Sequence, residues 1–197
     1  MSRLLAGALA LSVLVASACA PTPAPAPSPP PPPAASYPIV GGASMDPRVT
    51  MFLNISKSAD HRILVSALRG AGTAQALSSA GAYTLFAPSD SAFRRLPNGT
   101  MDALLHPRSR FELTSLVNYH VVPGARTRSR IMSDIQIGGG STTFRTQQGQ
   151  ILRARMEAGR VVLTDMNGRR SYVTQADITH ANGVFHVVDA VLLPDQG

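Results

Sequence analysis

The sequence predicts an α+β domain in which most helices precede most strands. Apolar residues recur at helical spacing between residues 46 and 132, interrupted by one buried strand near residues 83–87, and from residue 134 onward they follow the two-residue period of strands. Length is the third observation, because a region of about 150 residues can bury one core and leaves no room for a second domain.

Each expected helix has a recognisable beginning. Two core helices are expected between residues 46 and 79, with Asp46 and Asp60 as N-caps and with Gly70 and Gly72 ending the second. Further helices are expected after Ser89, after Thr100, after the capping-box pattern Ser109-Arg110-Phe111-Glu112, and after Thr127. The helix after the capping box is expected to carry the apolar residues Phe111, Leu113, Leu116 and Val117.

The strand at residues 83–87 is followed, after the helices, by a series of alternating segments. An Asn167-Gly168 hairpin turn is expected to join two of them. The strands are expected at residues 134–137, 142–146, 151–156, 160–164, 172–178 and 184–192.

Residues 1–18 have the layout of a secretory signal peptide. Arg3 precedes an apolar run from Leu4 to Val15, and the small residues Ala16-Ser17-Ala18 follow. The apolar run is shorter than the roughly 20 residues that a membrane-spanning helix needs. We therefore expect this segment to be removed and the rest of the chain to be exported.

Cys19, the single cysteine of the chain, follows directly. A cysteine at this place resembles the lipobox of bacterial lipoproteins, in which it is acylated and becomes the new N-terminus. The alternative is an ordinary signal peptidase site that leaves a secreted or periplasmic protein with a free thiol. Residues 19–44 are expected to be a disordered linker, because nine prolines lie between positions 21 and 33, and the folded domain is expected at residues 45–197.

The charge of the chain does not indicate a nucleic-acid partner. The formal net charge is +7, but the arginines are dispersed in short groups with few aromatic residues among them. Nucleic-acid binding requires a continuous basic face interleaved with stacking residues. A basic surface attracted to anionic polysaccharide or lipid head groups stays open as a weaker alternative.

Three segments resemble the landmarks of the fasciclin (FAS1) domain family. Residues 83–93, Tyr-Thr-Leu-Phe-Ala-Pro-Ser-Asp-Ser-Ala-Phe, are similar to its first signature box, and residues 182–194, Asn-Gly-Val-Phe-His-Val-Val-Asp-Ala-Val-Leu-Leu-Pro, to its second. Between them, Asn-Tyr-His-Val-Val-Pro-Gly at 118–124 resembles the Tyr-His pair that ends a helix and enters a strand. The resemblance implies a wedge of two β-sheets flanked by several short helices, and an adhesion or binding module.

The same resemblance supplies four candidate adhesion residues. Tyr119 and His120 belong to the Tyr-His landmark, a region that is associated in the family with adhesion through integrin-type receptors. Asp177 and Ile178 are similar to the family's Asp-Ile adhesion motif, without the basic residue or proline that often precedes it. From the residues alone, the alternative for Tyr119 and His120 is a structural role in the core.

No pattern in the sequence predicts catalysis, a cofactor or a metal. Ser89, His120 and Asp189 lack the context of a nucleophile elbow, and Ser89 is explained as a helix cap. His61 and His106 are expected to be exposed, and the histidines do not have the spacing of a zinc site.

The sequence thus supports two functions, neither of them enzymatic. The first is an interaction module at the cell surface, or secreted, that binds a protein or polysaccharide partner. The alternative is a carrier of a small apolar ligand such as a pigment or lipid, because the chain is rich in Ala, Val, Leu and Met.

Overall fold

The computed structural model of the chain describes residues 37–195. The expected signal peptide, Cys19 and the proline run of the expected linker lie outside these residues. In the described part, no helix combines the length and the apolar character needed to cross a bilayer.

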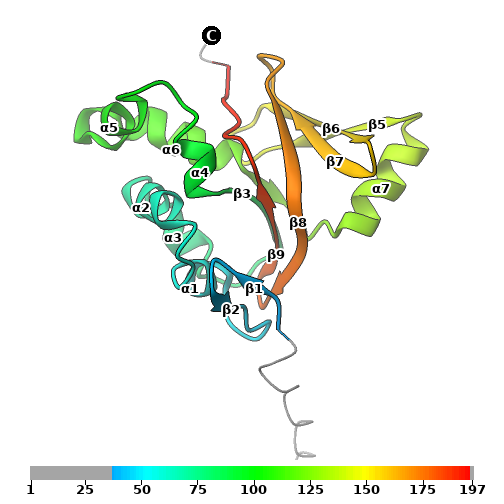
Figure 1. The fold of residues 1–197 in the computed structure, drawn as a ribbon, viewed down its shortest axis with the longest axis horizontal. Helices are drawn as coiled ribbons and strands as arrows, with labels where there is room; N and C mark the ends of the chain where they lie inside the picture. Colours follow the sequence, from blue (N-terminus) through cyan, green and yellow to red (C-terminus); the bar gives the residue numbers. More distant parts are fainter. Residues whose placement is uncertain (1–36, 196–197) are drawn as a thin grey trace, which may run out of the picture. The chain divides into compact units, whose positions relative to one another are not determined.

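The described residues contain short helices and strands in an α+β arrangement (Figure 1). The helices are α1 (Met51–Ile55), α2 (Arg62–Gly70), α3 (Thr73–Ala76), α4 (Asp90–Phe93), α5 (Thr100–Leu105), the 3-10 helix η2 (Pro107–Ser109), α6 (Arg110–Tyr119) and α7 (Arg128–Ile137). The strands are β1 (Ile39–Val40), β2 (Ala43–Ser44), β3 (Tyr83–Pro88), β4 (Val121–Pro123), β5 (Ser141–Arg145), β6 (Ile151–Glu157), β7 (Arg160–Thr164), β8 (Arg170–His180) and β9 (Gly183–Val188).

Strand β8 joins two sheets into one ladder of seven strands. The order is β4-β3-β9-β8-β7-β6-β5, and β3 runs parallel to β9 while the other neighbours are antiparallel. The first part of β8 pairs with β7 and the remainder with β9, with register shifts between Val173 and Ile178. These irregularities lie where the two sheets diverge, because a bulge bends a strand and increases its twist. The expected α+β wedge of two sheets is therefore confirmed.

The strands of the two signature boxes, β3 and β9, form the parallel pair of the sheet, second and third from the β4 edge. Leu85 lies beside Phe185 in the register, and both belong to the apolar cluster that includes α1, α2 and α6. Phe86 lies beside His186 and belongs to a second cluster with β5, β6, β7 and α7. Figure 1 shows α1–α6 on one side of β3 and β9, and α7 with β5–β7 on the other. Successive residues of one strand therefore face two different cores.

One expected strand is wrong. Residues 134–137 form the last turn of α7, because Ile131 and Ile135, four residues apart, are both buried in the second cluster. Asp134 accepts from the guanidinium of Arg130 one turn earlier, which also suits a helix. The alternation that suggested a strand is short and fits both periods.

Several expected helix caps differ from the structure. Ser89 accepts a hydrogen bond from the N–H of Ala92, as expected. Asp46 instead accepts from the N–H and guanidinium of Arg48, and α1 begins five residues later at Met51. The hydrogen bonds to Arg48 lower the pKa of Asp46 to about 2.

Three other expected caps are also absent: a distant residue takes the place of one, and backbone geometry takes the place of two. The N–H of Ile63 in α2 donates to Asp90 at 2.9 Å, so the carboxylate of the first box takes the place expected for Asp60. Gly99, rather than Thr100, occupies the N-cap position of α5. Ser109 makes no capping hydrogen bond, because η2 runs directly into α6.

The end of the stretch expected to be a linker contains a short β-hairpin. Ile39 and Val40 of β1 pair with Ala43 and Ser44 of β2, and Val40 is buried in the first cluster. Gly41, at the turn, has a φ of +54°, and a Cβ there would lie 2.3 Å from Ser58 Oγ. A side chain at position 41 would therefore displace the loop that precedes α2.

Candidate functional site

The Tyr-His landmark lies inside the domain, between α6 and the second box. Tyr119 is 0% exposed and its hydroxyl donates to the carbonyl of Ile151 at 2.9 Å. His120 is 2% exposed; its Nδ1–H donates to the carbonyl of Leu116, and its Nε2 accepts from the N–H of Leu192 at 3.1 Å. Both side chains thus connect backbone segments that are far apart in the sequence.

Burial also changes the acid–base behaviour of the landmark. Removal from water raises the pKa of Tyr119 to about 12. It lowers the pKa of His120 to about 4, against the opposing effect of the hydrogen bond to Leu116. His120 is therefore a neutral imidazole near neutral pH and does not supply a charge to a partner.

Asn182, at the start of the second box, connects that box to the N-terminal helices. Its Oδ1 accepts from the N–H of Met51 at 2.8 Å, and its Nδ2 donates to the carbonyls of Leu77 and Ser79. The first N–H of a helix has no partner inside the helix, so Asn182 supplies one from the neighbouring strand turn. This role was not predicted from the sequence.

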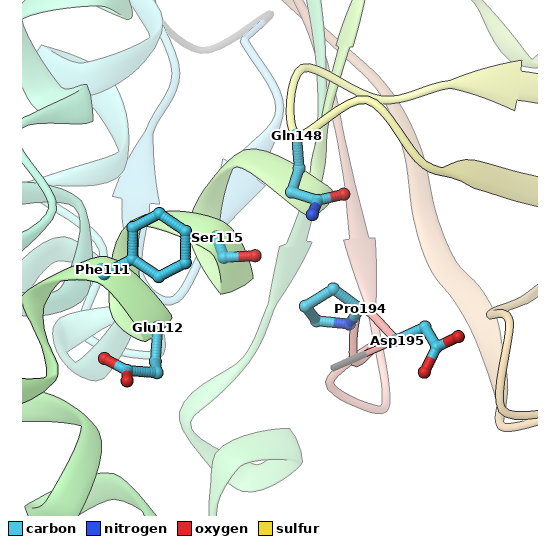
Figure 2. A pocket seen from close by; sticks show the side chains of 6 residues that line it. All are labelled: Phe111, Glu112, Ser115, Gln148, Pro194 and Asp195. Carbon is cyan, nitrogen blue, oxygen red and sulfur yellow. The ribbon is translucent and has the colours of Figure 1, made fainter. Parts of the chain in front are cut away.

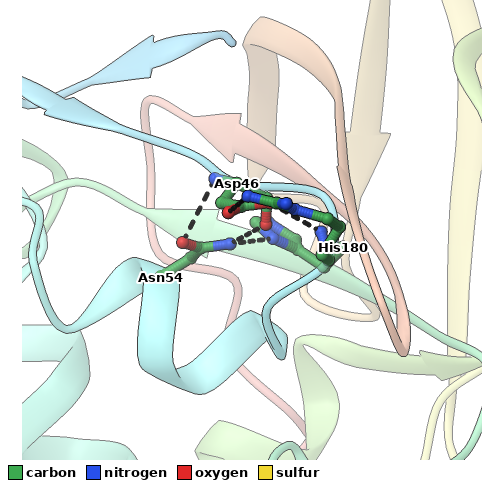
Figure 3. Close-up of polar contacts among 4 residues, drawn as sticks. Asp46, Asn54 and His180 are labelled. Atoms are coloured by element: carbon green, nitrogen blue, oxygen red, sulfur yellow. Dashed lines mark hydrogen bonds and ion pairs between the residues drawn. The ribbon is translucent and has the colours of Figure 1, made fainter. Parts of the chain in front are cut away.

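Asn54 makes a second buried polar link, drawn in Figure 3. Its Nδ2 donates to the carbonyl of Asp46 at 2.6 Å and lies 2.8 Å from Nδ1 of His180, while its Oδ1 accepts from the N–H of Asp46. The ring of His180 also stacks on Phe185, with centroids 4.9 Å apart. Burial lowers the pKa of His180 to about 4. The contacts hold the loop before α1 against β8.

Asp177 lies at the bulge of β8 and is exposed. Its φ is +61°, a left-handed conformation that aspartate tolerates better than most residues. Its Oδ1 accepts from the N–H of Arg128 at 2.6 Å, and its own N–H donates to Nδ1 of His186. The Nε2–H of His186 in turn donates to the carbonyl of Arg126. Asp177 therefore fixes the beginning of α7 as well as presenting a carboxylate at the surface.

The structure places only one of the four candidate adhesion residues at the surface. Ile178 is 0% exposed and packs in the first cluster, and Tyr119 and His120 are buried as described above. Asp177 is the exposed member. Asp177 is thus exposed at the bulge of β8, while its neighbour Ile178 is buried.

Ser89, His120 and Asp189, which could suggest a catalytic triad, each form hydrogen bonds with other residues. Ser89 Oγ accepts from Ala92 and contacts Ser91 Oγ, His120 bonds to Leu116 and Leu192, and Asp189 Oδ1 accepts from the N–H of Tyr172. The structure therefore does not bring these three side chains together. Within residues 37–195, no group of three or more histidine, cysteine or carboxylate side chains is placed to hold a metal ion.

His61 corrects another expectation, because it is 1% exposed rather than solvent-accessible. Its Nδ1 lies 2.9 Å from Ser58 Oγ and its ring lies against Phe185. Burial lowers the pKa of His61, opposed by the nearby carboxylates of Asp90 and Asp60. His106 is exposed, as expected.

A surface hollow of about 280 Å³ lies between α6 and the C-terminal segment. Figure 2 shows Phe111, Glu112 and Ser115 on one side and Pro194 and Asp195 on the other, with Gln148 at the turn between β5 and β6. The rim is held by Gln150, which accepts from the N–H of Asp195 and donates to its carbonyl.

Phe111 is the unexpected member of this hollow. Helical spacing predicted it as part of the apolar stripe of α6, yet it is 83% exposed. The buried residues of that stripe begin two residues later, at Leu113, and include Leu116 and Val117. An exposed aromatic ring beside polar groups is typical of protein interaction sites.

A second hollow, of about 500 Å³, lies where the two boxes end. Hydroxyl and charged side chains dominate its lining, among them Ser89, Asp90, Arg94 and Asp189. Arg95 donates to the carbonyl of Asp189 at 3.0 Å and so connects the two boxes at this rim. Such a lining suits polar contacts and does not suit a small apolar ligand.

Comparisons with known proteins agree with this arrangement. The model of the fasciclin domain matches residues 59–194. Protein sll1483 of Synechocystis is 32% identical over 158 residues, which cover 79% of each chain. The immunogenic protein MPB70 of Mycobacterium bovis is 29% identical over 79% of this chain and 72% of its own.

Two further relatives are much longer than the matched region. Human periostin is 31% identical over 62% of this chain, but the match spans only 13% of periostin. A solved FAS1 domain pair from the insect cell adhesion molecule Fasciclin I superposes with a TM-score of 0.66 at 20% identity, over 75% of this chain and 52% of that one, and so shows the fold. From the matched family model and the Synechocystis relative, the chain belongs to the fasciclin (FAS1) domain family.

Proposed function

We propose that this protein is an exported interaction module that binds a protein or polysaccharide partner at the cell surface. Membership in the fasciclin family supports the proposal, because a FAS1 domain pair of the same fold comes from an insect cell adhesion molecule. The internal chemistry is consistent with it, because the polar groups of the three landmarks are used to join segments of the fold.

The observation that carries the proposal is the exposure of Phe111 beside the hollow of α6. Phe111 is 83% exposed, whereas full burial of such a side chain would contribute roughly 2 kcal/mol to stability. Glu112, Ser115 and Gln148 surround the ring with hydrogen-bonding groups. A central aromatic anchor with a polar rim is the usual composition of a binding hot spot.

Asp177 is the second proposed contact. Its carboxylate is at the surface of the bulge, while Ile178, Tyr119 and His120 are buried and contribute to the interior of the fold. We therefore assign direct contact with a partner to Asp177 and a structural role to the three buried residues.

We propose that an acyl chain on Cys19 anchors the protein to a membrane. A polyproline II linker of thirteen residues would extend about 40 Å at ~3.1 Å per residue, enough to hold the domain away from a membrane. Mass spectrometry of the mature N-terminus tests the anchor. An acylated Cys19 is expected, and a free thiol or cleavage elsewhere would show a secreted protein instead.

Deletion of the gene in its native host tests the function itself. Cell aggregation and biofilm mass are measured in the deletion strain, with the parent gene returned as the control. We expect the deletion to reduce attachment and the parent gene to restore it. Unchanged attachment on polysaccharide, protein and abiotic surfaces would overturn the proposal.

A further inference from the structure

The outer face of β5, β6, β7 and the first part of β8 is basic. Side chains alternate along a strand, so the residues that share this face follow from the register. Thr143, Arg153, Thr164 and Arg170 form one row across the four strands, and Ser141, Arg155, Val162 and Tyr172 form the next. Arg145 and Arg160 belong to the flanking rows, opposite Ile151 and Glu157 respectively.

No helix of the described residues packs on this face, because α7 contacts the other one. Ile131 and Ile135 of α7 lie in the second cluster with Phe144, Leu152 and Ala154, whose side chains point inward. Arg145, Arg153, Arg155, Arg160 and Arg170 are all exposed. The five guanidinium groups therefore share an open face of the sheet.

One carboxylate, that of Glu157, lies on this face of the four strands. It pairs with Arg155 and Arg170. Within residues 37–195, no carboxylate pairs with Arg145, Arg153 or Arg160. Five arginines and one glutamate leave an uncompensated positive charge, which attracts a polyanion.

Aromatic contacts hold part of this charge in place. The guanidinium of Arg160 lies 4.6 Å from the ring centre of Tyr172, and that of Arg170 lies 5.4 Å from it. Val162, which pairs with Tyr172 in the register, is 0% exposed. The arginines therefore lie along the sheet with restricted freedom, which lowers the entropy lost on binding a ligand.

A hollow of about 260 Å³ adjoins the basic face. Its lining includes Ile151, Arg153, Thr164 and Met166. Met166 is 56% exposed and Ile151 is 40% exposed, so the hollow offers apolar walls together with a guanidinium and a hydroxyl. Asp165 also lines the hollow, but it is 5% exposed and its carboxylate oxygens accept from backbone N–H groups of neighbouring segments. Its volume is below the roughly 300–1,000 Å³ of pockets for drug-sized ligands, and suits a single small ring.

We propose that this face binds an acidic polysaccharide that carries carboxylate groups. The planar guanidinium matches a carboxylate in two parallel hydrogen bonds, and Thr143, Thr164 and Ser141 present hydroxyls between the arginines. One sugar ring would lie in the hollow, with its C–H face against Ile151 and Met166 and its carboxylate toward Arg153. The inference rests on the proposed function and narrows its partner to one class, but the surface shares no lining residue with the Phe111 hollow, so each site can fail without the other.

Binding of the full-length chain to immobilised polygalacturonate tests the proposal. Neutral dextran and vesicles containing phosphatidylglycerol serve as comparison surfaces. We expect binding to polygalacturonate that weakens with added salt, with little binding to dextran and weaker binding to the vesicles. Absence of binding to polygalacturonate, or tighter binding to the vesicles, would overturn the assignment.

Two sets of variants distinguish binding by the basic face from binding by net charge alone. Replacing Arg153, Arg155 and Arg170 with glutamine is expected to weaken binding about tenfold or more. The matched control replaces Arg62, Arg108 and Arg110, which are exposed on α2, η2 and α6, and is expected to retain binding. An equal loss in both variants would show that net charge alone governs binding, and would contradict the assignment.

Met166→Ala tests the hollow without a change of charge. We expect it to weaken binding to polygalacturonate several-fold while the thermal unfolding midpoint stays close to that of the parent. Unchanged binding would remove the hollow from the site.

Discussion

Nε2 of His120 accepts a hydrogen bond of 3.1 Å from the backbone N–H of Leu192. This contact joins the end of α6 to the end of the second signature box, 72 residues away in the sequence. Both residues are buried, so the N–H of Leu192 has no access to water as a substitute partner. The conspicuous Tyr-His landmark therefore acts inside the fold, and recognition of a partner has to use other residues.

His120→Phe should destabilise the domain. The replacement keeps a ring of similar size but leaves the N–H of Leu192 buried without an acceptor, so the free energy of unfolding should fall by about 2–4 kcal/mol. Urea denaturation checks this, with His106→Phe as the control. His106 is exposed and loses only the 3.3 Å hydrogen bond that its Nδ1 accepts from the N–H of Arg108, so its replacement should cost less than about 1 kcal/mol. A loss no larger than that of the control would show that the hydrogen bond is dispensable.

Stability should fall as the pH falls from about 6.5 to about 4. Burial lowers the pKa of both His120 and His180 to about 4, whereas an unfolded histidine titrates near 6.5. Between these values the unfolded chain binds more protons than the folded one, so the contribution is fully present above about pH 6.5 and is lost below it. Each histidine should account for about 3 kcal/mol over this window.

The variant His180→Gln isolates part of this pH dependence. His180 is one of several buried histidines whose pKa is lowered, so without it the loss of unfolding free energy between about pH 7 and about pH 4 should become smaller than in the parent. His106→Gln should keep the parent profile. Identical profiles for all three proteins would mean that buried His180 does not control acid stability.

Asn182→Ala should loosen the N-terminal helices. The change leaves the N–H of Met51 and the carbonyls of Leu77 and Ser79 without their side-chain partner, at a cost of about 2–4 kcal/mol in unfolding free energy. Hydrogen exchange should increase most in α1 and α3. Asn98→Ala, at an exposed loop position, is the control and should leave both measurements unchanged; equal behaviour of the two variants would contradict the role of Asn182.

Substitutions of Asp177 separate its structural role from its proposed recognition role. Asp177→Asn keeps an oxygen for the N–H of Arg128 and tolerates the left-handed backbone, so its stability should match the parent within about 0.5 kcal/mol. Asp177→Ala loses both advantages and should cost about 1–2 kcal/mol. Cells carrying the Asn variant should attach more weakly, since the carboxylate is gone. Full attachment with Asn would restrict Asp177 to its structural role.

Much of the fold follows from local patterns in the sequence. The parallel core strands could be located because the boxes are runs of buried residues, and Ser89 caps α4 as its position predicts. Residues 134–137 were assigned wrongly because four residues cannot distinguish a helical from a strand period when Ile135 and Ile137 alternate. The N-cap of α2 was predicted wrongly for a different reason. The N–H of Ile63 donates to Asp90, which lies close to it only in the tertiary structure.

The surface sites were harder to predict than the core. Phe111 has the spacing of a core residue, and only the packing of α6 shows that it faces solvent. Arg153 and Arg155 do alternate in the sequence, a pattern that places both on one face of a strand. Their neighbour Arg170 comes from another strand, so the basic face emerges only with the sheet register.

Attachment of cells that carry Phe111→Ser tests the central claim most directly. Ile137→Ser is the matched control, because Ile137 is 84% exposed at the end of α7 and does not line the hollow. Both variants should keep the parent's unfolding midpoint. The variants are compared at equal amounts of protein at the cell surface. We expect deletion-strain cells that carry Phe111→Ser to lose most of the attachment that the parent gene restores. Cells that carry Ile137→Ser should attach as well as cells with the parent gene. Attachment of the Phe111→Ser cells equal to that of the parent would contradict the account.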